Sequence, residues 1–247
     1  ATTAHAVIDL NQFFKRKFIL IQTGYDLFNE KTKRRTENVM YSMEWKEDKP
    51  VGRKGRSHAF KYIRLESYED TLNNLAFSEN PPQLLDTVRE NYLLSYMLDF
   101  ETKESACLLN VDKLNNPFDY ALNITQNQEC TEQKIDLVET FNYLIGLQIT
   151  KNNALKAYAS QIEGITLPAG KVYKTKIVEG TNRSGDNILV VWRNLLGDAA
   201  LDNRLLIKQV KDYIQKTGIA YKTIYVNGDN TLSNERTETD TWNVVLI

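Results

Sequence analysis

Two threonines near the start of the chain stand where a ligand could be held. Thr2 and Thr3 open a segment with apolar residues at helical spacing, and the apolar run Phe18–Gln22 follows shortly after it. The first N–H groups of a helix have no partner inside the helix, so they and the threonine hydroxyls can bind a ligand. We interpret a helix over Thr3–Phe14 and the strand after it as the second half of a nucleotide-cofactor motif. Its first half, a strand and a glycine-rich turn, is expected before residue 1.

Basic residues gather at two further places in the same part of the chain. Through Glu66 there are fourteen Lys and Arg against eight Asp and Glu, although the whole chain has a net charge of −1. Clusters of this kind attract the phosphate backbone of nucleic acids. A solvated helix face and a flexible loop would give the same pattern, so both interpretations stay open. The residues predicted to contact DNA are Lys31, Lys33, Arg34, Arg35, Arg53, Lys54 and Arg56.

Other chemistry-bearing residues favour structural roles. The run Asn80-Pro81-Pro82 is typical of a helix start, and Glu66, Glu69 and Asp70 favour helix capping over a pair of acids for hydrolysis. Cys107 and Cys130 have neither disulfide nor metal spacing, which is typical of reduced thiols in a cytoplasmic protein. We therefore assign no catalytic residue and no metal ligand.

Alternating strands and helices predict an α/β fold. In residues 1–78, helices over Thr3–Phe14 and Asp26–Tyr41 alternate with strands over Phe18–Gln22 and Tyr62–Leu65, and residues 46–57 are predicted to be a mobile loop. This order predicts part of a doubly wound sheet. No run approaches the ~20 apolar residues that span a membrane, and we expect no secretion signal.

Residues 79–247 predict a separate α/β domain. Asp136 and Glu139 have the spacing of a capping box, and Asp198 and Gly218 mark the two ends of a long helix. The predicted helices are Asp136–Leu147, Asp198–Thr217 and one that runs through Leu84, Leu85, Val88, Tyr92 and Tyr96. The predicted strands are Val172–Val178, Asn187–Trp192, Lys222–Val226 and Trp242–Leu246, with a hairpin that pairs Ala106–Val111 with Phe118–Ile124.

Several segments, in order from end to end, resemble one enzyme family. The run Thr2-Thr3-Ala4-His5-Ala6-Val7-Ile8 resembles the stretch after Phe-x-Gly-Ser-Gly in modification subunits of type III restriction-modification systems, which are adenine-specific DNA methyltransferases. Further segments similar to this family are Phe18–Ile21, Lys61–Asp70, Asn116–Tyr120, Asp136–Leu144, Val190–Arg193 and Tyr225–Asn230.

The resemblance implies a function and its cofactor. The parent reaction would be methyl transfer from S-adenosyl-L-methionine to N6 of adenine in a specific double-stranded DNA sequence. Thr2 and Thr3 would lie beside the cofactor, and Gln22 stands where the family usually has a glutamate that binds the ribose hydroxyls. Glutamine can accept that hydrogen bond but lacks the charge that strengthens it. Neither Gly-x-Gly nor Asp-Pro-Pro-Tyr occurs in the sequence, so we expect the chain alone not to transfer methyl groups.

The resemblance also implies partners. Residues 1–78 would belong to the methyltransferase domain, and residues 79–247 would form a C-terminal α/β domain. That domain would mediate a homodimer of the modification subunit or contact the restriction subunit. The alternatives are a non-enzymatic protein-interaction module derived from the family and a DNA-binding module that uses the two basic clusters.

Overall fold

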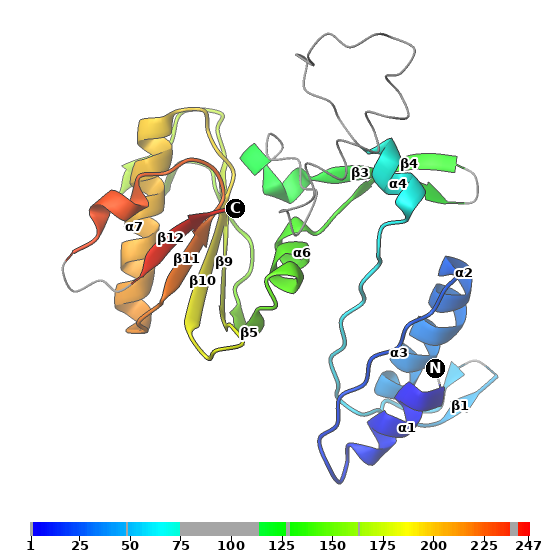
Figure 1. Cartoon of the computed structure of the whole chain (residues 1–247). Helices are drawn as coiled ribbons and strands as arrows, with labels where there is room; N and C mark the ends of the chain where they lie inside the picture. Colours follow the sequence, from blue (N-terminus) through cyan, green and yellow to red (C-terminus); the bar gives the residue numbers. More distant parts are fainter. Residues whose placement is uncertain (1, 48, 75–113, 127–128, 163, 238–241) are drawn as a thin grey trace. The chain divides into compact units, whose positions relative to one another are not determined.

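The chain folds into two compact units, which a computed structural model describes over residues 2–47, 49–74, 114–126, 129–162, 164–237 and 242–247 (Figure 1). The N-terminal unit is Ala1–Leu65 and the C-terminal unit is Glu66–Ile247. The domain boundary predicted between residues 78 and 79 lies outside the described residues. So do the Asn80-Pro81-Pro82 run, the helix predicted between Leu84 and Tyr96, Cys107 and the predicted strand Ala106–Val111.

The N-terminal unit is built around a small helical core. Helix α1 packs on α3, and Ala4 and Ile8 of α1 are fully buried, one turn apart, while Thr36 and Val39 of α3 are also buried. Three helical segments follow one another without a break, the middle one a π-helix. The elements are α1 (Thr2–Leu10), α2 (Tyr25–Leu27), η1 (Phe28–Lys33), α3 (Arg34–Tyr41), β1 (Trp45–Lys46) and β2 (Lys49–Pro50).

The doubly wound sheet predicted for this unit is not formed by its described residues. Phe18–Gln22 and Tyr62–Leu65, both predicted as strands, are irregular, and Ile19 and Ile21 are 88% and 92% exposed. A strand is stable only where its backbone groups find partners. Among the described residues of this unit, the ladder between β1 and β2 is the one sheet, so neither apolar run has a neighbour to pair with.

The C-terminal unit contains a mixed six-stranded sheet, which confirms the α/β class in its coarse form. The strand order is β12-β11-β10-β9-β5, and β6 also pairs with β9. β10, β11 and β12 run parallel, whereas β9 is antiparallel to β10 and β5. The strands are β5 (Gln148–Asn152), β6 (Lys156–Tyr158), β9 (Tyr173–Thr181), β10 (Asn187–Arg193), β11 (Thr223–Val226) and β12 (Asn243–Leu246).

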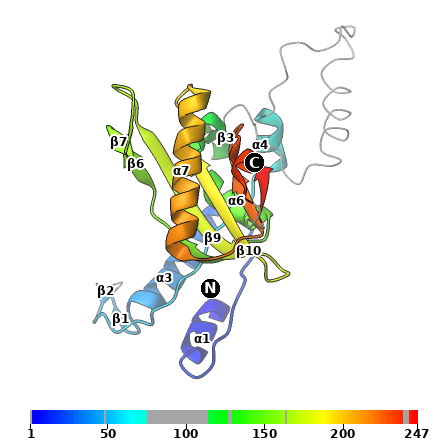
Figure 2. The same ribbon diagram turned by 90° about the vertical axis from the view of Figure 1, so that its left-hand side faces the viewer.

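Helix α7 (Ala199–Thr217) covers one face of this sheet (Figure 2). The Asp198 carboxylate accepts hydrogen bonds from the N–H groups of Ala200 and Leu201, and Gly218 ends the helix in the left-handed conformation. Both signals were predicted from the sequence and are confirmed. Leu206 and Val210 of α7 pack against strand residues such as Val191 in a buried core. Because α7 connects β10 to the parallel strand β11, it forms the crossover of a β-α-β unit.

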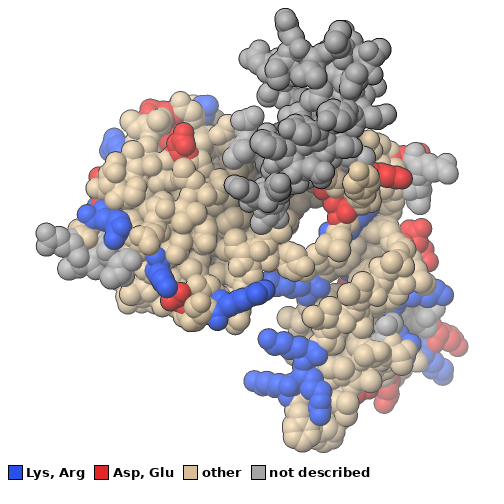
Figure 3. Space-filling view, in the orientation of Figure 1, with Lys and Arg blue, Asp and Glu red and all other residues tan. Residues whose placement is uncertain are grey.

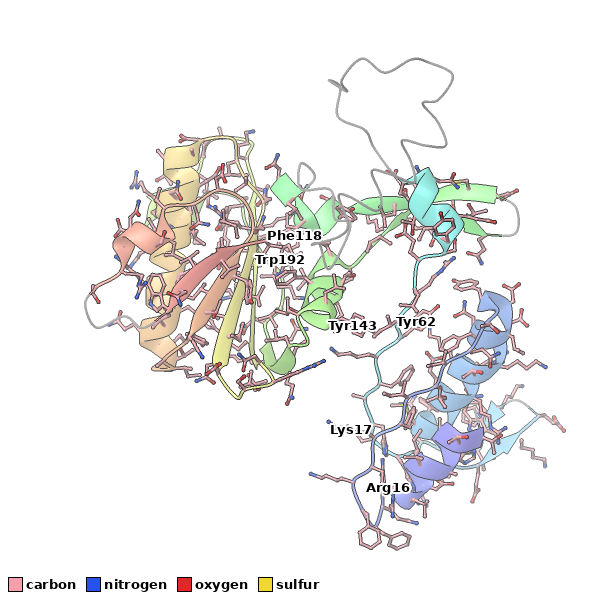
Figure 4. All side chains as sticks on the ribbon, in the orientation of Figure 1. Arg16, Lys17, Tyr62, Phe118, Tyr143 and Trp192 are labelled. Atoms are coloured by element: carbon pink, nitrogen blue, oxygen red, sulfur yellow. The ribbon has the colours of Figure 1, made fainter. Side chains whose placement is uncertain are left out.

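Helix α6 (Leu137–Leu144) lies on the other face. Asp136 caps it by accepting a hydrogen bond from the N–H of Glu139, as the capping-box spacing predicted. Leu137 and Phe141 belong to a second core with Trp192, which Figure 4 labels. The rings of Phe141 and Trp192 meet edge to face, with centroids 5.5 Å apart. The central strand β10 is therefore buried on both faces.

The hairpin near residue 120 differs from the prediction. β3 (Ala121–Gln126) pairs with β4 (Glu129–Lys134), which the sequence analysis did not identify as a strand. α4 (Tyr68–Asn73) contacts β3, and the Asp70 carboxylate accepts a 2.7 Å hydrogen bond from the N–H of Thr125. Glu69 and Asp70 lie in the first turn of α4, where the Ser67 hydroxyl accepts a hydrogen bond from the N–H of Asp70, and the Asp70 carboxylate in addition supports β3. The sequence also did not predict β5 and β6. The remaining elements, likewise not predicted, are η3 (Pro117–Asp119), β7 (Gln161–Ile162), β8 (Ile165–Thr166) and η4 (Leu232–Glu235).

Two buried polar residues join the carboxyl ends of β10 and β11. Arg193 and Asn227 are both fully buried. The Asn227 side chain accepts a hydrogen bond from the N–H of Arg193 and donates to the carbonyls of Arg193 and Leu114. Ligands often bind at this edge of α/β sheets, but the Asn227 side chain is engaged with backbone groups, which is a structural role.

We predict that Asn227→Ala lowers the free energy of unfolding by about 3 kcal/mol, because it leaves buried backbone groups without partners. The measurement is urea unfolding followed by tryptophan fluorescence. Asn234→Ala, at an exposed position in η4, is the matched control and should change stability by less than about 0.5 kcal/mol. Equal stabilities of the two variants would contradict the structural role of Asn227.

Candidate nucleic-acid interface

The first predicted basic cluster lies along one continuous helical run. Lys31 is in η1 and Arg34 and Arg35 begin α3, and all three are exposed. Residues three and four apart lie on the same helix face, so these cations are neighbours. Lys33 points elsewhere: its ammonium is 3.9 Å from Glu37 and 5.2 Å from the ring centre of Tyr62. π-Helical turns occur frequently at functional sites.

The second basic cluster follows the end of α3. The guanidinium of Arg53 lies 6.0 Å from the ring centre of Tyr41, the last residue of α3, and Arg53 and Lys54 are exposed. A Cβ on Gly55 would lie 2.0 Å from the carbonyl oxygen of Met40. The loop predicted to be mobile therefore packs closely against the helix end, and only a residue without a side chain fits at position 55.

Arg56 is more enclosed than the other predicted cations. Its Nε lies 3.6 Å from the carboxylate of Asp9, and its Nη2 donates a 2.7 Å hydrogen bond to Gln12. These contacts tie the loop to α1 and balance part of the charge of Arg56. Arg53 and Lys54 are therefore better placed than Arg56 to meet a phosphate.

The two clusters stand at opposite ends of α3. The helix runs from Arg34 to Tyr41, which at ~1.5 Å per residue places its ends about 10 Å apart. Because successive phosphates of one DNA strand are separated by about 3.4 Å of helix axis, this length corresponds to about three base pairs. The arrangement can place cations on several phosphates of one backbone.

A third basic run was not identified from the sequence. Lys15, Arg16 and Lys17 are exposed after α1, and Lys and Arg gather on this side of the unit in Figure 3, where Figure 4 labels Arg16 and Lys17. The signal was present, because three consecutive cations precede the apolar run that starts at Phe18.

The residues predicted to bind the cofactor are not brought together as a group. Thr2 and Thr3 are exposed in the first turn of α1, and the Thr2 hydroxyl accepts a 3.3 Å hydrogen bond from Arg35. Gln22 is exposed, and its amide donates to the carbonyl of Thr23. Within the described chain no hydrogen bond joins Gln22 to either threonine. These contacts do not assemble a site for S-adenosylmethionine.

Comparisons with family models, with curated proteins and with solved structures found no match to this chain. Within the described residues, no group of three or more His, Cys, Asp or Glu is arranged to hold a metal ion. None of the described helices has the length and apolar character needed to cross a membrane.

We predict that Gly55→Ala detaches the basic loop from α3, because the added methyl group would overlap the backbone of Met40. Limited trypsin digestion should cleave after Arg53, Lys54 and Arg56 several times faster than in the unchanged protein. Gly52→Ala is the matched control, since a Cβ at Gly52 meets nothing within 4 Å. Identical digestion of the two variants would show that the loop does not pack as described.

Proposed function

We propose that the chain is part of an S-adenosylmethionine-dependent DNA adenine N6-methyltransferase of a type III-like restriction-modification system. In this proposal the N-terminal unit contacts double-stranded DNA. The resemblance of ordered segments along the chain supports the family. The observation that carries the DNA contact is the exposed face formed by Lys31, Arg34 and Arg35, with Arg53 and Lys54 at the other end of α3.

The chemistry of these side chains suits phosphate recognition. A guanidinium presents a planar fork of donors that matches a phosphate, and an ammonium acts as a compact charge. Their binding should be independent of base sequence and strongly salt-dependent. The proposed role of the described residues is therefore to hold the DNA, while methyl transfer is the reaction of the complete enzyme. The same surface supports the alternative of a DNA-binding module without enzymatic activity.

Replacing Arg34 and Arg35 together by Ala tests this role. We predict weaker binding to a duplex oligonucleotide and a salt dependence, as log Kd against log salt, with a slope smaller by about 2, because two phosphate contacts are lost. The measurement is fluorescence anisotropy over a series of salt concentrations.

The control is Lys171→Ala with Lys216→Ala, which removes two exposed cations from the C-terminal unit. It should leave the slope unchanged. If the arginine variant and the lysine variant bind duplex DNA alike, the proposed DNA-binding face is wrong.

We propose in addition that the C-terminal unit forms a homodimer through β12. Among the described strands, β12 ends the sheet order, and its Val245 and Leu246 are 39% and 56% exposed. The N–H of Asn243 donates to the carbonyl of Lys222, just before β11, and the N–H of Ile247 donates to the carbonyl of Val226 in β11. Strand alternation therefore turns the N–H of Leu246 outward. An apolar edge of this kind can pair with a second strand, and two copies related by a twofold axis would extend the sheet.

We predict that Leu246→Lys converts the dimer to a monomer, because a charged side chain on an edge strand blocks strand pairing. Light scattering coupled to size-exclusion chromatography gives the mass. Leu155→Lys is the control, since Leu155 is 48% exposed and lies between β5 and β6. A Leu246→Lys variant that keeps the mass of a dimer, or an unchanged protein that is monomeric, would refute dimerisation through β12.

A further inference from the structure

Three aromatic rings and two cations form a connected cluster on the N-terminal unit. The rings of Phe28 and Tyr62 are stacked, with centroids 5.0 Å apart and planes 15° from parallel. The ammonium of Lys33 lies 5.2 Å from the Tyr62 ring centre, and the guanidinium of Arg64 lies 4.6 Å from that of Tyr25. Residues from the helical run and from the extended segment around Tyr62 (Figure 4) thus meet at one place.

The cluster is open to solvent. Tyr25 and Tyr62 are 37% and 39% exposed, and Arg64 is exposed and makes no ion pair with a described carboxylate. Burial of part of the ring and the nearby Tyr25 raise the pKa of Tyr62 against the opposing effect of Arg64, so the phenol is neutral at physiological pH. The two tyrosine rings and Arg64 are therefore accessible on the surface, and Lys33, which also lies 3.9 Å from Glu37, stands beside them.

The chemistry of the cluster fits an unpaired nucleobase with its phosphate. Bases stack on aromatic rings and on guanidinium groups, and the adjacent backbone is held by Lys and Arg. An acidic peptide would satisfy the cations without using the rings. An apolar partner would remove water from Lys33 and Arg64 and would provide no hydrogen bonds to compensate for the desolvation. Of these partners, only a nucleotide uses both the rings and the charges.

The position of the cluster favours the same occupant. Tyr25 and Phe28 lie on the helical run that continues into Lys31, Arg34 and Arg35, so stacking residues and phosphate-binding cations are within a few turns of each other. In an intact duplex the faces of the bases are covered by their neighbours. The rings would therefore add nothing to duplex binding and would act only on a base that has left the stack.

We propose that the cluster of Tyr25, Phe28, Lys33, Tyr62 and Arg64 binds an unpaired base of single-stranded nucleic acid by stacking. This inference rests on the proposed DNA-binding function and adds a second binding mode to it. Lys33 and Arg64 have flexible side chains. On binding, the ammonium of Lys33 and the guanidinium of Arg64 move from the ring faces to the phosphates beside the stacked base. The rings and the exposed face of α3 then hold neighbouring parts of one strand.

The test uses the full chain and a thymidine oligonucleotide that contains one 2-aminopurine, single-stranded and in a duplex. Stacking on the rings changes the fluorescence of 2-aminopurine in the single strand. Tyr25→Leu and Tyr62→Leu should each weaken single-strand binding by about tenfold to hundredfold and remove that change. Tyr62→Phe keeps the ring and should bind like the unchanged protein. Circular dichroism establishes whether each variant is folded. If Tyr62→Leu is unfolded, the binding of Tyr25→Leu alone tests the stacking site.

The control is Tyr143→Leu, which removes a tyrosine that is 55% exposed on α6. Single-strand binding that survives Tyr25→Leu, or that falls equally with Tyr143→Leu, would overturn the stacking site. Duplex binding that depends on Arg34 and Arg35 would still stand in that case. Conversely, ring-dependent single-strand binding with no affinity for the duplex would overturn the proposed duplex contact and leave the stacking site intact.

Discussion

Complete burial of one strand is the constraint on which the C-terminal unit depends. Leu189 and Val191 of β10 face the core under α7, and Val190 and Trp192 face the core under α6, all of them fully buried. A strand that is apolar on both faces requires a helix layer on each side and a pairing strand at each edge. The polar groups where β10 ends must then be satisfied internally, which explains the hydrogen bonds made by Asn227.

The N-terminal unit is organised differently, because its core is small and its surface is charged. Ala4 and Ile8 provide the fully buried apolar side chains, while the basic loop is fixed by the close approach of Gly55 to Met40 and by the contacts of Arg56 with α1. Exposed ion pairs contribute little to stability. The remaining cations are therefore available to a partner, and a polyanion is the partner that their density favours.

Cation–ring contacts shape that surface in a way that ion pairs would not. A carboxylate beside Arg64 would cancel its charge, whereas the ring of Tyr25 orients the guanidinium and leaves the charge in place. The same holds for Arg53 over Tyr41. The ring orients the cation while its attraction for phosphate is retained. Arg53 belongs to the proposed duplex contact and Arg64 to the proposed stacking site, so each site includes one cation beside a ring.

The sequence by itself determined those features that depend on near neighbours. Asp198 and Gly218 set the ends of α7, and the run Asn187–Trp192 was predicted as the strand that became β10, because capping and strand patterns act over a few residues. Only the tertiary structure decided that Phe18–Gln22 stays unpaired and that Lys33 and Phe28 meet Tyr62. The contacts of Lys33 and Phe28 with Tyr62 join residues about thirty positions apart. The local sequence pattern of such residues is the same whether or not the partner is in place.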